Sequence, residues 1–154
     1  FGLMLTKNGP KVIEYNCRFG DPETQVVLPL LETDLLTVMQ NVTNETLNNI
    51  EVKFSNKNAC CVIMASNGYP QSYEKGYEIT IPEDITSNVY VAGGALKDDK
   101  LVTSGGRVLG VTAVEETLEQ AIKSSYAKVE KIKNYKLYKT LGSVVGIGLC
   151  IILI

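Results

Sequence analysis

Three polar side chains that could hold a metal ion and a phosphate stand at alternate positions near the start of this 154-residue chain. They are Glu14, Asn16 and Arg18, and apolar or aromatic residues fill the places between them. Residues two apart in a strand share a face, so the polar series would line one face and the apolar series would anchor the strand in a core. Carboxylate and amide oxygens suit Mg²⁺, and a guanidinium binds phosphate at two points. The pattern favours a metal–phosphate site, and the alternative is an exposed polar strand face.

The segment that follows, Gly-Asp-Pro-Glu-Thr at 20–24, is typical of a helix start. Asp21 is expected to cap the first amides, and Pro22 suits the first helical position. Glu23 adds a negative charge where the helix dipole favours one. We expect Asp21 and Glu23 to support this helix.

A second candidate site is Ser-Gly-Gly-Arg at 104–107. Gly105 and Gly106 would let backbone amides approach a ligand closely, and Arg107 would clamp an anion. The alternative is a hairpin turn that ends in a solvated arginine.

The pattern of elements predicts an α+β fold in two parts. Residues 1–50 are expected to form a hairpin around Asn8-Gly9 and two helices, and residues 51–139 a mainly β domain with one packing helix. Strands are predicted at 59–66, 77–82, 88–96, 100–106 and 107–114, with a turn at Asp98-Asp99 and helices from 21, over 33–42 and over 115–133.

Composition excludes several functions. The net charge is −2, which gives no electrostatic reason to bind nucleic acid. The chain has no histidine, and its four cysteines make no Cys-x-x-Cys pair, so we expect buried thiols in a reducing compartment. The opening Phe-Gly-Leu-Met-Leu shows no basic leader, so we expect a cytoplasmic protein.

Three longer segments resemble one family of enzymes. Residues 2–31, which contain Glu-Tyr-Asn-Cys-Arg-Phe-Gly-Asp-Pro-Glu-Thr-Gln, resemble the end of the ATP-grasp region of phosphoribosylamine–glycine ligases. Residues 62–76 and 102–113 resemble the C-terminal domain of the same family, in the same order. The resemblance implies an ATP-dependent ligase of purine synthesis that joins glycine to 5-phosphoribosylamine through glycyl phosphate. The alternatives are a different ATP-grasp ligase or carboxylase, and a non-catalytic, membrane-tethered remnant.

The resemblance also implies roles for the candidate residues. Glu14 and Asn16 would bind Mg²⁺ or Mn²⁺ between the phosphates of ATP, and Arg18 would be the catalytic residue that steadies the transferred phosphoryl group. Asp21 and Glu23 would then also orient Arg18. The segment from Gly105 to Arg107 would reach the ribose phosphate of the substrate.

The two ends depart from the family pattern. The family's N-terminal domain, its ATP-covering lid and its adenine-binding segments have no counterpart here, so the chain is expected to be inactive alone and to need that part as its partner. Beyond Lys139 the resemblance is lost, and a frameshift or an unspliced intron would explain residues 140–154. The apolar run of 14 residues from Leu141 to Ile154 is shorter than the about 20 that span a membrane. We therefore expect an aberrant tail with few contacts to residues 1–138, and no membrane partner.

Overall fold

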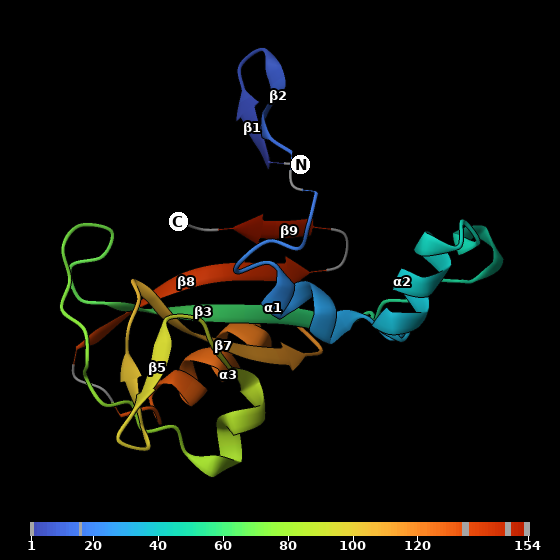
Figure 1. Cartoon of the computed structure of the whole chain (residues 1–154). Coiled ribbons are helices and arrows are strands. Elements are labelled where there is room, and N and C mark those ends of the chain that lie inside the picture. The colour runs from blue at the N-terminus through green and yellow to red at the C-terminus, as the bar shows by residue number, and fades with distance from the viewer. Residues whose placement is uncertain (1, 16, 134–135, 147–148, 153–154) are drawn as a thin grey trace.

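The computed structural model describes the backbone of residues 2–15, 17–133, 136–146 and 149–152, and side chains up to residue 139. The fold is α+β, as predicted, with antiparallel strand pairs (Figure 1). The strands are β1 (Gly2–Thr6), β2 (Gly9–Glu14), β3 (Asn58–Ser66), β4 (Val89–Val91), β5 (Gly94–Lys97), β6 (Lys100–Thr103), β7 (Arg107–Glu115), β8 (Leu137–Gly146) and β9 (Leu149–Ile152). The α-helices are α1 (Thr24–Val27), α2 (Leu35–Thr43) and α3 (Leu118–Val129), and short 3₁₀ helices are η1 (Leu28–Leu30), η2 (Leu47–Asn49) and η3 (Glu83–Asn88).

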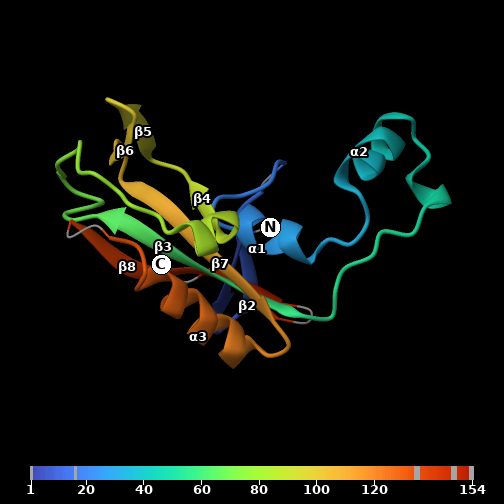
Figure 2. The same cartoon turned by 90° about the horizontal axis from the view of Figure 1, so that it is seen from below.

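The core is a five-stranded sheet in the order β4-β7-β3-β8-β9. Every residue of β3 is buried, because this strand lies in the middle and both of its faces are covered. On one face, Cys60, Val62 and Met64 pack in a cluster that includes residues of α3. On the other face, Ala59, Cys61 and Ile63 pack against Val26 of α1 and Leu30 of η1. Figure 2 shows α3 lying along the sheet. The alternation of strand side chains thus builds two separate apolar layers.

Helix α3 confirms the helix predicted from apolar spacing, although it begins and ends a few residues inside the predicted limits. Its start is fixed by a capping box, in which the Thr117 hydroxyl accepts from the Gln120 amide and the Gln120 side chain accepts from the Thr117 amide. Ser125 ties the helix to the sheet by donating to the carbonyl of Cys60 over 2.8 Å. The buried face of α3 therefore has a fixed position on β3.

The β5–β6 hairpin confirms the turn predicted at Asp98-Asp99. Both aspartates have positive φ, at 50° and 60°, a conformation that Asp tolerates and that matches the twist of a two-residue hairpin. The strand predicted over 77–82 is wrong, since this segment makes only the isolated bridges of Glu78 with Val102 and Thr80 with Lys133. A bridge at each of two places fixes an extended segment without forming a ladder.

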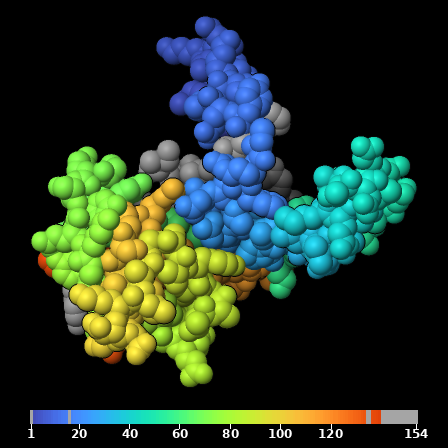
Figure 3. All heavy atoms as spheres, viewed as in Figure 1, coloured from blue at the N-terminus to red at the C-terminus, as the bar shows by residue number. Residues whose placement is uncertain are grey.

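The N-terminal hairpin β1–β2 and the arm that carries α2 both project from the body of the molecule (Figure 3). The predicted hairpin is confirmed, although its turn residues are Lys7 and Asn8, and Gly9 already pairs with Thr6. Helix α2 is also confirmed, and Asp34 caps it by accepting from the Thr37 amide over 2.7 Å. The prediction that the apolar series of β2 is anchored in a core is wrong. Ile13 and Tyr15 are 61% and 66% exposed. Two strands that pair chiefly with each other cannot bury a face.

The segment beyond Lys139 does not behave as predicted for an unattached tail. The backbone of β8 pairs with β3 along the ladder from Ala59–Val145 to Ser66–Leu137, and β9 pairs with β8. The expectation of few contacts is therefore wrong. The reason is that β3 has a second edge whose amide and carbonyl groups need a partner strand. Within the described part of the chain, no helix is both long and apolar enough to cross a membrane.

Candidate functional site

The predicted metal–phosphate face is only partly formed. Strand β2 ends at Glu14, Arg18 lies in a bend beyond it, and Asn16 lies outside the described residues. The expectation that one strand carries all three side chains on one face is therefore wrong for Arg18. Among the described residues, the ladder between β1 and β2 runs from Thr6–Gly9 to Gly2–Glu14. Both Glu14 and Arg18 are exposed at the base of the hairpin.

Asp21 does not cap the helix that follows. Helix α1 begins at Thr24, and Glu23 stands at the cap position without a side-chain hydrogen bond. The amides of Thr24 and Val27 are satisfied instead by the carbonyls of Gly20 and Glu23, each over 2.9 Å. The predicted capping role is therefore wrong for Asp21, and Glu23 holds only the position of a cap.

The carboxylate of Asp21 is held from two sides. One oxygen accepts from the side-chain amide of Gln25 over 2.7 Å, and the other lies 3.3 Å from a guanidinium nitrogen of Arg107. The second terminal nitrogen of Arg107 donates to the backbone carbonyl of Asp21 over 3.0 Å. The two candidate segments from opposite halves of the chain thus meet. No local pattern predicts this pair, since 86 residues separate its members.

The two glycines before Arg107 are needed for packing. The Gly105 amide donates to the carbonyl of Gly93 over 3.0 Å, and its carbonyl accepts from the Ser66 hydroxyl over 2.8 Å. A β-carbon on Gly106 would stand 2.1 Å from a ring carbon of Tyr69. The expected approach of the Gly105 amide to a ligand is therefore not what the structure shows, because that amide already has a partner.

A cavity of about 320 Å³ opens beside this junction. Its wall is mostly apolar and is formed by the turn before α1, by α1 itself and by β4 and the residue after it, with the members Phe19, Gly20, Asp21, Thr24, Gln25, Leu28, Tyr90 and Ala92. Burial raises the pKa of Tyr90 above its ordinary value, so its hydroxyl stays protonated near neutral pH. No sequence pattern indicates this cavity, because its wall joins residues 19–28 to residues 90–92.

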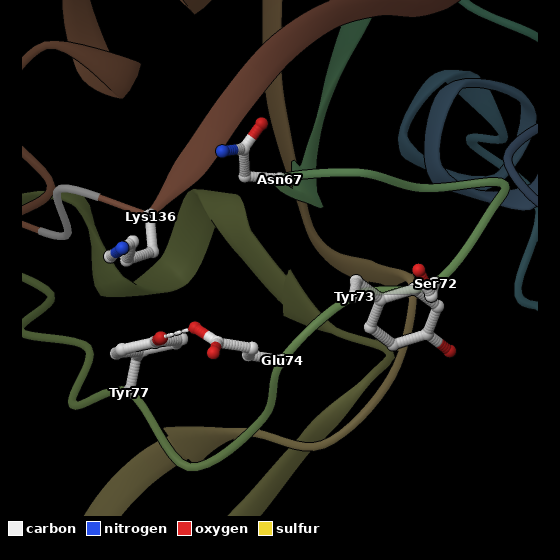
Figure 4. A pocket seen from close by; sticks show the side chains of 6 residues that line it. All are labelled: Asn67, Ser72, Tyr73, Glu74, Tyr77 and Lys136. Atoms are coloured by element: carbon white, nitrogen blue, oxygen red, sulfur yellow. Dashed lines mark hydrogen bonds between the residues drawn. The ribbon is translucent and has the colours of Figure 1, made fainter.

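A second cavity of about 320 Å³ lies under the loop that follows β3 (Figure 4). Three of the polar residues that line it, Glu74, Tyr77 and Lys136, contact one another. The Tyr77 hydroxyl donates to the Glu74 carboxylate, which raises the pKa of Tyr77, and the Lys136 ammonium lies 5.4 Å from the centre of the Tyr77 ring. This arrangement closes the end of the loop, and it stays outside the candidate site.

The donors for a metal ion are few. Among the residues that the structure describes, no group of three or more His, Cys, Asp or Glu side chains is close enough to hold a metal. Mg²⁺ keeps several waters and usually takes only one or two carboxylates, with phosphates of the substrate completing its shell. The exposed carboxylate of Glu14 fits that requirement.

Two family models match the parts of the chain that contain the candidate site residues. Residues 1–24 match the model for "Phosphoribosylglycinamide synthetase, ATP-grasp (A) domain", and residues 59–139 match the model for "Phosphoribosylglycinamide synthetase, C domain". The chain is 49% identical over 138 residues to a phosphoribosylamine–glycine ligase of Caldanaerobacter subterraneus. This alignment covers 89% of the chain and 33% of that relative. The chain is also 52% identical over 136 residues to a human trifunctional purine biosynthetic protein, and this alignment covers 86% of the chain and 14% of that protein.

A solved structure agrees with these matches. The crystal structure of a phosphoribosylamine–glycine ligase from Thermotoga maritima superposes with a TM-score of 0.71 at 38% identity, over 90% of this chain and 34% of that one.

These matches define the class first: residues 1–24 are similar to part of an ATP-grasp domain, and residues 59–139 to the C domain that belongs with it. More particularly, the chain belongs to the phosphoribosylglycinamide synthetase family. The alternative of a different ATP-grasp ligase or carboxylase is not supported, because both matched models describe the same enzyme. The chain spans about a third of the length of the single-function relatives it matches.

Proposed function

We propose that this chain supplies the C-terminal third of an ATP-dependent ligase that joins glycine to 5-phosphoribosylamine in purine synthesis. The observation that carries the proposal is the order of the matches, with the ATP-grasp match at residues 1–24 and the C-domain match at residues 59–139. The names of the relatives, phosphoribosylamine–glycine ligase and trifunctional purine biosynthetic protein, support the substrates.

In this proposal Glu14 and Asn16 hold the divalent cation, Mg²⁺ or Mn²⁺, at the phosphates of ATP. When bound, the cation neutralises charge on the phosphates. Arg18 lies two residues beyond Asn16 and donates to the oxygens of the transferred phosphoryl group, since a guanidinium suits a planar two-point contact. These residues act mainly by positioning and by charge, which is what phosphoryl transfer requires of a protein.

A chimeric ligase tests the proposal. In this chimera, residues 1–139 replace the matching third of the Caldanaerobacter ligase, and the product is assayed for glycine-dependent release of phosphate from ATP in the presence of phosphoribosylamine. We expect turnover close to that of the unmodified Caldanaerobacter enzyme. A chimera that folds, as judged by circular dichroism, but has no activity would contradict the proposal.

The 154-residue chain by itself is expected to bind ATP only weakly. Affinity depends on many contacts made at once, and this chain spans about a third of the length of the phosphoribosylamine–glycine ligase it matches. Titration calorimetry with ATP and MgCl₂ should show no binding at micromolar concentrations. A dissociation constant in the micromolar range would show that the chain contains a nucleotide site that the proposal does not include.

A further inference from the structure

The contact between Arg107 and Asp21 crosses from one matched segment to the other. Asp21 lies within the ATP-grasp match, and Arg107 lies within the C-domain match. Arg107 binds both the backbone carbonyl and the carboxylate of Asp21, over 3.0 and 3.3 Å. A two-point contact that includes a backbone atom fixes the place of the turn itself, and not only the place of one side chain.

The backbone of Arg107 is held by the central sheet. Arg107 is the first residue of β7, and it pairs with Ala65 across a register shift in the β3–β7 ladder. Of the two preceding glycines, Gly105 is packed against Gly93 and Gly106 against the Tyr69 ring. The guanidinium therefore extends from a rigid point at the end of the central sheet, whereas the turn at 20–23 belongs to a short connection.

The turn at residues 20–23 directly follows the proposed phosphate-binding segment, residues 14–18. Arg18 lies three residues before Asp21, and β1 and β2 make most of their contacts with each other. In the described residues, the segment from Gly20 to Leu31 is what joins this hairpin to the central sheet (Figure 1). Asp21 is therefore a held point only three residues from Arg18.

We propose that Arg107 is a positioning residue, which acts through Asp21 to set Arg18 and Glu14 against the C-terminal domain. This inference rests on the proposed function, and it differs from the expected direct contact of Arg107 with the ribose phosphate. Both partners are about half exposed, at 42% and 46%, so the pair contributes little to global stability. Its removal should change the geometry of the site far more than the melting temperature.

The first test uses the 154-residue chain and measures amide hydrogen exchange. Arg107→Ala should speed exchange of the Thr24 amide, which donates to Gly20, by about fivefold, as expected for loss of an exposed ion pair. Asp21→Asn should have a smaller effect, because the carbonyl contact remains. The Ala121 amide in α3 should be unchanged in both variants. Lys100→Ala, which breaks the exposed ion pair with Glu78, is the matched control and should leave Thr24 unchanged.

The second test uses the chimeric ligase. Arg107→Ala should lower kcat about tenfold, because misplacement of Arg18 and Glu14 affects the reacting geometry. The KM values for ATP, glycine and phosphoribosylamine should change by factors that are similar to one another. Arg107→Lys should restore part of the loss, and the double variant with Asp21→Ala should be no worse than Arg107→Ala alone. Melting temperatures should stay within 2 °C of one another, about the change expected from a loss below 1 kcal/mol.

The outcomes separate the alternatives. A selective rise in the KM for phosphoribosylamine, with Thr24 exchange unchanged, would make Arg107 a substrate ligand and overturn the inference. Faster exchange without any loss of kcat would also overturn it, since the contact would then be structural only. If the unsubstituted chimera is inactive, the proposed function fails, while unchanged exchange in Arg107→Ala would independently show that Arg107 does not hold the turn.

Discussion

Glu14→Gln is expected to lower kcat of the chimeric ligase by about 100-fold or more. The substitution keeps the size of the side chain and removes the negative charge that the proposed cation needs. Loss of one group that stabilises charge in a transition state costs a factor of this order. Glu14 is exposed at the end of β2, so folding should be unaffected. Steady-state kinetics at several MgCl₂ concentrations would measure the change.

The control for this experiment is Glu51→Gln. Glu51 is an exposed carboxylate that pairs with Lys53, far along the chain from the hairpin, and its loss should leave kcat unchanged. Binding of Mn²⁺ in the presence of ATP, followed by electron paramagnetic resonance, gives a second readout that does not depend on turnover. Equal activity and equal Mn²⁺ affinity in Glu14→Gln and the parent chimera would remove Glu14 from the site.

The largest expected loss of stability comes from Leu109→Ala. Leu109 lies on β7 opposite Met64 of β3 and is fully buried in the layer covered by α3. Truncation removes apolar burial and leaves a cavity, and costs about 3 kcal/mol. For a domain of this size the melting temperature should fall by roughly 10 °C. Differential scanning calorimetry of the 154-residue chain would measure it.

Leu96→Ala supplies the matched control. The same truncation is made in β5, where Leu96 is 79% exposed, and the free energy of unfolding should change by less than about 0.5 kcal/mol. Comparable losses in both variants would mean that Leu109 is not packed in the layer covered by α3.

Local patterns predicted most of the elements, because each depends on neighbours in the chain. The hairpin around Asn8-Gly9, helix α2, the buried strand β3 and the long helix α3 all follow from turn residues and hydrophobic periodicity. The strand expected over 77–82 failed for the opposite reason. Its alternation fits a strand, but a ladder also needs a partner along its whole length, and here bridges form only at Glu78 and Thr80.

The candidate site shows a similar division. The residue types of Glu14 and Arg18 indicated phosphate chemistry, but their spacing suggested one shared strand, and β2 ends too early for that. Asp21 was expected to satisfy nearby amides, yet its partner is Arg107, a residue whose proximity only the tertiary fold creates. Long-range ion pairs of this kind leave no periodic trace in a sequence. The substrate-binding roles of Gly106 and Arg107 and the place of the domain boundary near residue 50 stay predictions.

The cysteines show a further consequence of the alternating faces of β3. Cys17 is exposed, contrary to the expectation of buried thiols, whereas Cys60 and Cys61 are buried. Although adjacent in sequence, Cys60 lies in the layer with α3 and Cys61 in the layer with α1. Burial raises the pKa of both thiols, to about 11 for Cys61, which keeps them as unreactive thiols at neutral pH. Each becomes open to an alkylating reagent only when its own layer loosens. Neighbouring residues thus act as independent chemical reporters for the opening of opposite sides of the same strand.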